Sequence, residues 1–385
     1  MKKDIIIFGA GKFGRMALVK YGERVAYFMD NNKDLWGNKI AGIEIRNVEE
    51  GIKDREDKIV VIAAKYKDEM IVQLENLGIN DYVFYQEDSQ SYYEMDDLVY
   101  NPYLDNPVRD MSENDWNSTI QNSYIIDLIN ERVEKIYGTP LLFNHIEIET
   151  INRCNGICDF CPVSHGNDSR EFKEMTWELF ESIINQLAEM DYAGKIALFS
   201  NNEPFLDKTI IEKHRYAREK LPCARFHLFT NGTLLSLDKF IEIMKYLDEL
   251  VIDNYNQELK LIPTCKEIAD YCELHPELKK KVTIVLRKPH EVLTTRGGDA
   301  PNRKELVLYS NEKCLLPFKE MIVRPDGKVS LCCSDPLGKE TLGDLSKESI
   351  MDVWNGNKFK KVRDALYKGR GYFEHCKYCD NFRLV

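Results

Sequence analysis

The run Asn152-Arg153-Cys154-Asn155-Gly156-Ile157-Cys158-Asp159-Phe160-Cys161-Pro162 says more about this chain than any other stretch. Its three cysteines have C-x3-C-x2-C spacing and follow an apolar segment expected to be a strand. On one loop, three thiolates can hold three irons of a cubic 4Fe-4S cluster and leave the fourth iron open, because cluster iron prefers Cys sulfur. The spacing therefore predicts a reactive cluster with Cys154, Cys158 and Cys161 as its ligands.

Strand and helix patterns alternate outward from this loop, which predicts a parallel sheet wrapped by helices. The expected strands are 145–150, 195–200, 224–230, 249–253 and 282–287, and the expected helices are 176–189, 208–220, 237–247 and 260–274. The carboxyl ends of such strands share one rim, so the cysteine loop should face the loops that follow the other strands.

With Phe160 just before its third cysteine, the motif resembles that of the radical S-adenosylmethionine (SAM) enzymes. In that family SAM binds the open iron, and an electron from the cluster cleaves it to methionine and a 5′-deoxyadenosyl radical that abstracts hydrogen from carbon. The resemblance implies a partial (β/α)6 barrel over residues 144–305. The alternatives are a zinc site or three unrelated thiols, but zinc sites more often show two C-x2-C pairs or a pair with two His.

Rim positions match further family motifs. Glu203, in Ser200-Asn201-Asn202-Glu203-Pro204, stands where the family carries Gly-Gly-Glu-Pro, which implies that its carboxylate accepts from the SAM ammonium. Thr230-Asn231-Gly232 matches the family's Thr-Asn-Gly, and Asp253 lies near the position of a ribose contact, although Val251 replaces the usual Ser.

Arg287 and Arg296 are expected to bind the SAM carboxylate or a substrate anion, the alternative for each being a surface ion pair. The SAM-site residues implied by the resemblance are thus Phe160, Ser200, Asn202, Glu203, Thr230, Asn231, Asp253, Arg287 and Arg296. The sequence identifies no catalytic acid or base.

A second set of cysteines lies near the end of the chain. Cys314 precedes a hairpin with the turn Pro325-Asp326-Gly327, the strand 328–331 leads to Cys332, and Cys376-x2-Cys379 follows. On spacing alone, four thiolates fit a closed 4Fe-4S cluster and a structural zinc equally well.

Together with the helix at Trp354-Asn355, this set resembles the SPASM and twitch extensions of radical SAM enzymes. Those extensions bind auxiliary 4Fe-4S clusters, and the short chain after the C-x2-C pair matches the twitch form with one cluster. The resemblance implies an auxiliary-cluster domain over 306–385 with Cys314, Cys332, Cys376 and Cys379 as ligands, and Cys333 as the alternative to Cys332.

Residues 1–95 predict a separate Rossmann-like unit. Strands and helices are expected to alternate here, as strand 5–8, helix 15–21, strand 25–29, strand 59–63 and helix 68–77. The loop Gly9-Ala10-Gly11-Lys12-Phe13-Gly14 suits a phosphate at a helix N-terminus, and Asp30 suits a ribose hydroxyl, so Gly9, Gly11, Gly14 and Asp30 are candidate nucleotide-binding residues. Alternatively, the glycines only pack helix against strand in a domain that binds a partner. The run Phe28-Met29-Asp30-Asn31-Asn32, with Trp36-Gly37 and Ile40-Ala41-Gly42, is similar to the N-terminal domain of sugar-modifying acyltransferases that hold a nucleotide sugar.

Residues 96–143 are expected to be a linker with turns at Asn101-Pro102 and Asn106-Pro107, ending in a helix over 120–137. The formal charge of −11 argues against nucleic-acid binding. No apolar run reaches membrane-span length, and the chain opens with a strand rather than a signal peptide, which indicates the cytoplasm. Eleven cysteines there are expected to be ligands or buried thiols.

We therefore expect an α/β radical SAM oxidoreductase with SAM, a reactive 4Fe-4S cluster, one auxiliary 4Fe-4S cluster and a flavodoxin- or ferredoxin-type reductant. The expected reaction is dehydrogenation or epimerisation of a sugar, polyol or nucleotide-linked sugar. Epimerisation needs a thiol to return hydrogen, whereas Cys223, Cys265, Cys272 and Cys333 are expected only to pack. A peptide-modifying radical SAM enzyme and a non-enzymatic zinc-bearing binding protein are the alternatives.

Overall fold

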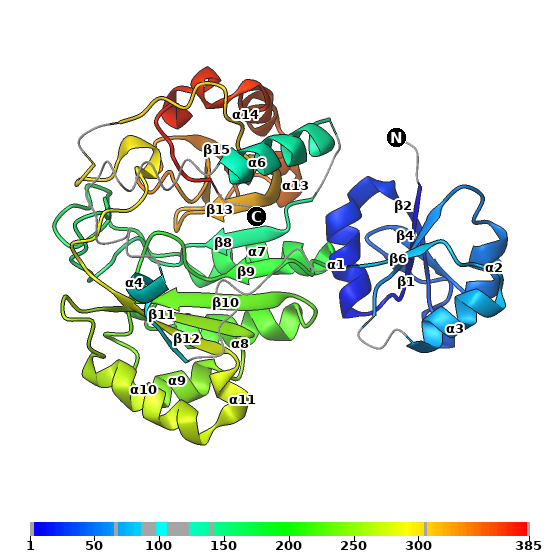
Figure 1. The fold of residues 1–385 in the computed structure, drawn as a ribbon, viewed down its shortest axis with the longest axis horizontal. Helices are drawn as coiled ribbons and strands as arrows, with labels where there is room; N and C mark the ends of the chain where they lie inside the picture. Colours follow the sequence, from blue (N-terminus) through cyan, green and yellow to red (C-terminus); the bar gives the residue numbers. More distant parts are fainter. Residues whose placement is uncertain are drawn as a thin grey trace.

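The computed structural model describes residues 4–64, 68–85, 98–105, 123–138, 142–303 and 306–382. Two sheets organise these residues, one with the order β3-β4-β2-β1-β5-β6 and one with the order β15-β14-β13-β8-β9-β10-β11-β12-β7. Figure 1 shows the first sheet in a small N-terminal unit, blue to cyan, beside a larger body that holds the second sheet. None of the helices in these ranges is long and apolar enough to cross a membrane.

The N-terminal unit has the expected order of strand, glycine loop, helix and strand. Strand β1 is buried along its length and pairs in parallel with β2 and β5. The strands are β1 (Ile5–Phe8), β2 (Val25–Met29), β3 (Lys39–Ile40), β4 (Ile43–Arg46), β5 (Ile59–Ile62) and β6 (Tyr82–Phe84), and the helices are α1 (Lys12–Tyr21), α2 (Val48–Lys53) and α3 (Asp68–Asn76).

The larger body contains the five predicted parallel strands in sequence order. They are β8 (His145–Ile148), β9 (Lys195–Ala197), β10 (Arg225–Thr230), β11 (Glu249–Tyr255) and β12 (Val282–Arg287), each paired in parallel with the next. The covering helices are α7 (Trp177–Glu189), α8 (Ile210–Lys220), α9 (Leu237–Ile243), α10 (Pro263–Leu274) and α11 (Pro276–Lys279). Helix α10 begins at Pro263, three residues later than expected, because proline suits the first helical position.

Two parts of this sheet differ from the expectation. Strand β7 (Val99–Tyr100), from the stretch expected to be only a linker, pairs in parallel with β12. The C-terminal region continues the same sheet, because β13 (Glu320–Val323) pairs in parallel with β8 and antiparallel with β14 (Lys328–Ser330). The remaining elements are β15 (Thr341–Asp344), α4 (Pro102–Asp105), α6 (Ser123–Ile136), α12 (Leu316–Lys319), α13 (Ile350–Trp354) and α14 (Asn357–Lys368). The expected turn at Asn106-Pro107 and residues 120–122 lie outside the described ranges.

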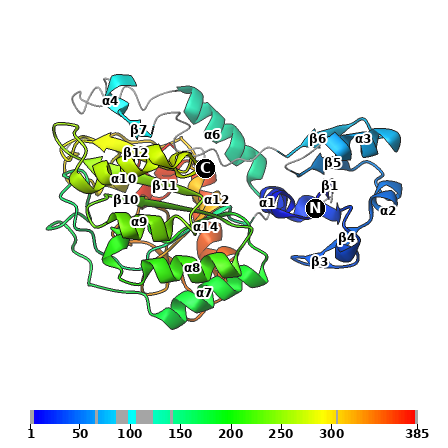
Figure 2. The same ribbon diagram turned by 90° about the horizontal axis from the view of Figure 1, so that it is seen from below.

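The N-terminal unit lies at the amino ends of the barrel strands. Ala193, just before β9, is fully buried with the core of that unit, and Cys223, just before β10, packs against it. Arg15 of α1 pairs with Asp191 at 2.5 Å. Figure 2 shows α1 between the two bodies from a second direction. The unit is therefore at the opposite end of the barrel from the rim of carboxyl ends.

Candidate active site

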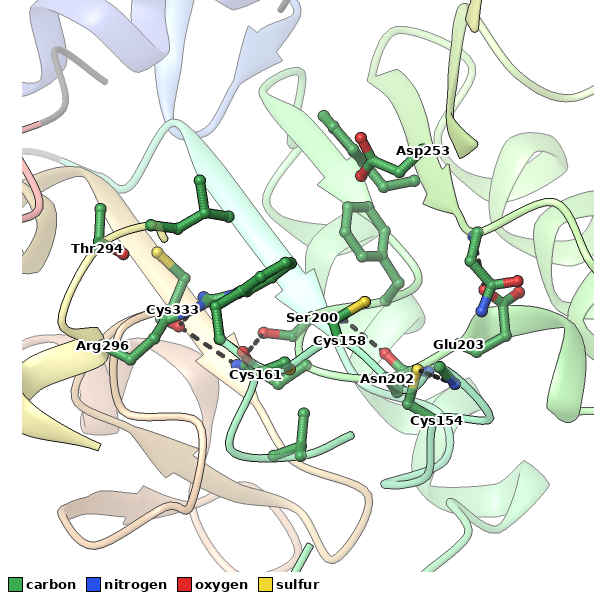
Figure 3. Close-up of a pocket in the computed structure, with 18 of the residues that line it drawn as sticks. Cys154, Cys158, Cys161, Ser200, Asn202, Glu203, Asp253, Thr294, Arg296 and Cys333 are labelled. Carbon is green, nitrogen blue, oxygen red and sulfur yellow. Dashed lines mark hydrogen bonds between the residues drawn. The ribbon is translucent and has the colours of Figure 1, made fainter. Parts of the chain in front are cut away.

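The loop after β8 brings its three predicted thiols to one cavity at the rim. Cys154, Cys158 and Cys161 line this cavity of about 610 Å³ (Figure 3). The Sγ of Cys154 accepts the N–H of Gly156 at 3.3 Å. Burial, with the neighbouring thiols, raises the pKa of Cys154 and Cys158 to about 12 each. Three sulfurs that line one cavity from one short loop, Cys158 buried and the other two half-buried, fit a thiolate-bound cluster, whose irons supply the positive charge that such thiolates need.

Glu203 is buried at the end of the next rim loop and is only 1% exposed. Its Oε1 accepts from the Phe205 N–H at 3.0 Å and from the Thr230 hydroxyl at 2.8 Å, and its Oε2 accepts from the Asn231 N–H at 2.8 Å. Burial raises the pKa of Glu203, and these hydrogen bonds oppose the rise. A carboxylate oxygen accepts about two hydrogen bonds, so Oε2 keeps one acceptor position for a cation in the cavity.

The two positions before Glu203 also face the cavity. Asn202 Oδ1 accepts the N–H of Ser200 at 2.9 Å, which fixes the loop where the family has glycines. Its Nδ2 is buried and has no hydrogen-bond partner in the described part of the chain. A buried donor without a partner beside a cavity fits a ligand with an acceptor group, such as the SAM carboxylate.

Arg287 is a buried ion-paired residue of the cavity wall rather than a surface one. Its Nη1 lies 3.4 Å from Asp253 Oδ1 and its Nε donates to Glu291 Oε1 at 2.6 Å. Phe160 lies across the cavity, its ring 6.2 Å from that of Tyr255. All nine predicted SAM-site residues thus line this one cavity, at the carboxyl ends of the five barrel strands or in the segments that follow them.

Arg296 enters the cavity from the C-terminal side. Its φ of +51° is a strained conformation for a residue with a Cβ. Asp380 holds this conformation, because its carboxylate accepts from the N–H and the hydroxyl of Thr295 at 2.7 and 3.0 Å. The Nη1 of Arg296 donates to the Cys333 carbonyl at 3.4 Å, so the guanidinium faces the part of the cavity away from Glu203.

The four C-terminal thiols gather around one buried cation. Cys314, Cys332, Cys376 and Cys379 are each 6% exposed, and Arg370 is 1% exposed. Burial acts to lower the pKa of Arg370, but the four cysteines raise it above its usual value. Arg370 also donates to the carbonyls of Cys379 and Asn381 at 2.6 and 2.8 Å. Four thiolates around a closed cluster carry net negative charge, so a guanidinium among them fits that site.

Cys333 does not share this arrangement. It lines the large cavity, and its Sγ lies 3.9 Å from Asn381 Nδ2. The geometry thus separates the two neighbours, since Cys332 belongs with the other three thiols and Cys333 faces the cavity. This agrees with the Gly-x4-Cys spacing that favours Cys332. Cys333 packs in the hydrophobic core, as expected, and also lines the cavity.

The glycine loop of the N-terminal unit borders a separate cavity of about 280 Å³. A Cβ on Gly9 would lie 2.6 Å from the Ala63 carbonyl, and one on Gly14 would lie 1.8 Å from the Gly9 carbonyl, so packing alone explains these two glycines. Gly11 has open space beside it. Asp30 already accepts from the N–H groups of Ala10 at 2.6 Å and Asn32 at 2.8 Å. Nucleotide binding here stays a prediction.

Several cavity residues were not foreseen from the sequence. They are Glu147, Phe199, Asn201, Phe229, Tyr255, Cys333, Asn381 and Phe382. Glu147 carried a signal, because it alternates with apolar residues in a strand whose carboxyl end was expected at the rim.

The comparisons agree with this geometry. The chain matches the Radical SAM superfamily over residues 148–260 and the SPASM iron-sulfur cluster-binding domain over residues 314–380. It is 31% identical over 241 residues to the S-adenosyl-L-methionine-dependent 2-deoxy-scyllo-inosamine dehydrogenase of Niallia circulans, which covers 62% of this chain and 94% of that enzyme.

Solved structures are similar as well. The crystal structure of BtrN in complex with AdoMet and 2-DOIA has a TM-score of 0.53 and 28% identity, over 62% of this chain and 94% of that one. Native anSMEcpe with bound AdoMet has a TM-score of 0.41 and 17% identity, over 61% and 88% of the two chains. Both family matches begin after the N-terminal unit.

Proposed function

This chain belongs to the radical SAM enzymes, and we propose that it oxidises a secondary alcohol of an aminocyclitol or a related polyol to a ketone. Its cofactors are SAM, the reactive 4Fe-4S cluster and an auxiliary 4Fe-4S cluster. The observation that carries the proposal is the single cavity between the two cysteine sets, which extends from Cys154 to Cys333, the neighbour of Cys332. The identity to a 2-deoxy-scyllo-inosamine dehydrogenase supports the substrate class.

We assign the cofactors and the substrate to different parts of the cavity and its surroundings. We assign Cys154, Cys158 and Cys161 to the reactive cluster, and Cys314, Cys332, Cys376 and Cys379 to the auxiliary cluster. When bound, these groups supply a 5′-deoxyadenosyl radical that removes hydrogen from carbon and an acceptor for the electron left behind. SAM is assigned to the wall that holds Glu203, Asn202, Thr230, Asn231, Asp253, Arg287 and Phe160.

The substrate is assigned to the end lined by Arg296, Ser200 and Asn381. These three side chains offer a guanidinium, a hydroxyl and an amide, which suit the hydroxyl and amino groups of such a substrate. We propose that a flavodoxin- or ferredoxin-type protein reduces the reactive cluster. We propose the cytoplasm as the location, because cluster ligands must be reduced cysteines and none of the eleven, all in the described ranges, forms a disulfide.

A nucleotide-linked sugar is a less favoured substrate. The glycine loop lies in a unit at the amino ends of the barrel strands, whereas the SAM cavity lies at their carboxyl ends. We propose that a nucleotide held by Gly11 and Asp30 is a ligand separate from the reacting molecule.

Anaerobic assay with 2-deoxy-scyllo-inosamine, SAM and dithionite tests the proposal. We expect one ketone for each 5′-deoxyadenosine, about eight irons per chain and no stoichiometric zinc. In the variant Cys376→Ala with Cys379→Ala, 5′-deoxyadenosine should still form while ketone formation stops. Ketone formation at the native rate by this double variant, or no ketone from the native enzyme, would contradict the proposal.

Epimerisation is the second candidate, because Cys333 places a thiol on the cavity wall. A thiol can return hydrogen to a carbon radical from the face opposite the SAM. Turnover in deuterated water separates the two reactions, since an epimerised product gains carbon-bound deuterium and Cys333→Ala prevents the gain. Loss of carbon-bound hydrogen with ketone formation indicates dehydrogenation instead.

A further inference from the structure

Three titratable side chains are buried inside the barrel, below the cavity. His145 and Glu147 lie on β8 and Glu320 lies on β13, with side chains 3%, 7% and 1% exposed. The alternate residues Ile146 and Ile148 belong to the hydrophobic core instead. Two carboxylates in a barrel interior destabilise the fold unless they are compensated, so apolar residues would be expected here on stability grounds alone.

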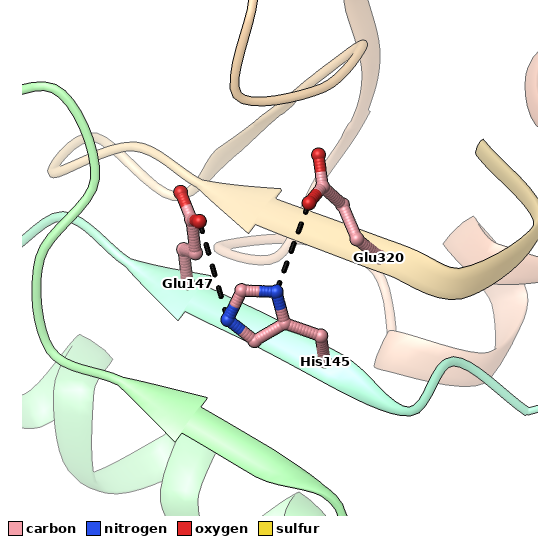
Figure 4. A group of neighbouring side chains, drawn as sticks. All are labelled: His145, Glu147 and Glu320. Atoms are coloured by element: carbon pink, nitrogen blue, oxygen red, sulfur yellow. Dashed lines mark ion pairs between the residues drawn. The ribbon is translucent and has the colours of Figure 1, made fainter. Parts of the chain in front are cut away.

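The three side chains form a row with His145 between the two carboxylates (Figure 4). Glu147, at one end of the row, lines the cavity. Glu147 Oε1 lies 4.0 Å from His145 Nε2, and His145 Nδ1 lies 3.7 Å from Glu320 Oε2. The two ring nitrogens of His145 face different carboxylates, so the three side chains form a row with His145 in the middle. The other oxygen of Glu320 accepts the Cys333 N–H at 3.0 Å.

Ser200 links this row to the substrate end. Its hydroxyl donates to Glu147 Oε2 at 2.6 Å, and both residues line the cavity. Asn201 Nδ2 donates to Ser200 Oγ at 3.2 Å and to the Cys333 carbonyl at 3.3 Å, which fixes the position of the serine. A serine hydroxyl that donates to a carboxylate can accept a proton with its free lone pair.

We propose that Glu147 is the proton acceptor of the alcohol oxidation and that Ser200 passes the proton to it. The inference rests on the proposed dehydrogenase function. Alcohol oxidation breaks the C–H bond with loss of a hydrogen atom to the 5′-deoxyadenosyl radical, sends one electron to the auxiliary cluster, and releases the O–H proton. Ser200 takes that proton as its own proton moves to Glu147 Oε2, and the C=O bond forms.

His145 acts as a positioning residue in this arrangement. Its ring lies between the two carboxylates, with Nε2 4.0 Å from Glu147 and Nδ1 3.7 Å from Glu320, and so holds the two carboxylates apart in fixed positions. Other titratable groups beside this row are Glu149, directly after β8, which pairs with Arg170 at 3.1 Å, and His227 on β10, whose ring lies 5.0 Å from that of His145. No residue of this row belongs to the assigned SAM wall, so substitutions in the row should affect the proton step.

The test compares Glu147→Gln with Glu147→Asp and Glu249→Gln in the holoenzyme with 2-deoxy-scyllo-inosamine. Glu249 is a matched control, because it is another buried barrel carboxylate, paired with Arg225 at 3.1 Å, and does not line the cavity. In Glu147→Gln we expect 5′-deoxyadenosine to form with ketone formation slowed by roughly 10²- to 10⁴-fold, the usual effect of losing a general base. Freeze-quenched samples should show a substrate-derived radical by electron paramagnetic resonance, and Glu147→Asp should restore part of the rate.

Calorimetry of substrate binding and a thermal melt accompany the assay. The substrate affinity and the melting temperature should change little in Glu147→Gln. Ketone formation by Glu147→Gln at the native rate and in the native ratio to 5′-deoxyadenosine overturns the proton-acceptor role while leaving the dehydrogenase intact. If the native enzyme yields no ketone, the proposed function fails and this role fails with it. Loss of ketone formation in Glu249→Gln to the same degree assigns the effect to barrel stability and also overturns the role.

Discussion

Replacing Glu203 by alanine tests the SAM wall most directly. The carboxylate already accepts three hydrogen bonds, two at Oε1 and one at Oε2, which leaves one position at Oε2 for the SAM ammonium. A hydrogen bond between charged groups contributes about 1.5–3 kcal/mol, so Glu203→Ala should weaken SAM binding by roughly 10- to 150-fold. The iron content should stay the same, because no thiolate is touched.

The same structure predicts a second effect of this variant. The buried N–H groups of Phe205 and Asn231 lose their acceptor, and each unsatisfied group costs about 1–3 kcal/mol. The unfolding free energy should therefore fall as well. Glu212→Ala, at an exposed position of α8, is the control that should change neither quantity.

Titration of SAM against the reduced cluster, followed by electron paramagnetic resonance, measures the affinity. Burial raises the pKa of Glu203, so the native affinity should fall as the pH drops toward that pKa and the carboxylate becomes neutral. Glu203→Ala should lack this part of the pH dependence. An affinity unchanged in the variant at neutral pH refutes the assignment and leaves Glu203 a structural residue.

Four further outcomes are expected. Cys158→Ala should abolish 5′-deoxyadenosine formation and halve the iron content, measured by reductive SAM cleavage and metal analysis, because each thiolate supplies one of three corners. Arg370→Met should lower the midpoint potential of the auxiliary cluster in a redox titration, because a buried cation stabilises the more negative reduced cluster. Arg370→Lys keeps the cation, so its midpoint potential should stay close to the native value. Gly11→Val, at a position with open space, should prevent binding of nucleotide sugars in calorimetry while SAM cleavage continues; a native isotherm would favour the partner-docking alternative. Burial raises the pKa of Glu149 to about 7, so the folded state prefers the protonated form of this side chain. The unfolding free energy of the native protein should therefore fall by up to about 3 kcal/mol from pH 4.5 to pH 7, and chemical denaturation of Glu149→Gln should show no such pH dependence.

The sequence was sufficient for features that local pattern determines. The five barrel strands follow from apolar segments separated by helical periodicity, and the cysteine spacings select both thiolate sets. The distance from Gly327 favours Cys332 over Cys333 as the ligand, because a hairpin turn sets the register of the strand that follows it, and this choice stays a prediction.

Other features depend on contacts between distant segments. Strand β7 has only two residues, too few for a pattern, and exists because β12 offers it an edge. Arg370 gives no local signal, since its partners are carbonyls of Cys379 and Asn381 and thiols up to 56 residues away, at Cys314. The cavity role of Cys333 likewise depends on how the C-terminal segment folds back over the rim.

The segment at Cys333 lies next to both the proposed electron acceptor and the proposed proton acceptor. The Cys333 N–H donates to Glu320 and the Cys333 carbonyl accepts from Asn201 and Arg296, so the backbone of one residue contacts the buried carboxylate row, the serine-bearing loop and the substrate end. Cys332, one residue earlier, belongs to the auxiliary thiols. A displacement of this segment would therefore alter the electron acceptor and the proton acceptor together. Variants of Glu320 should for this reason change both the auxiliary potential and the ketone yield, whereas variants of Glu147 should change the yield alone.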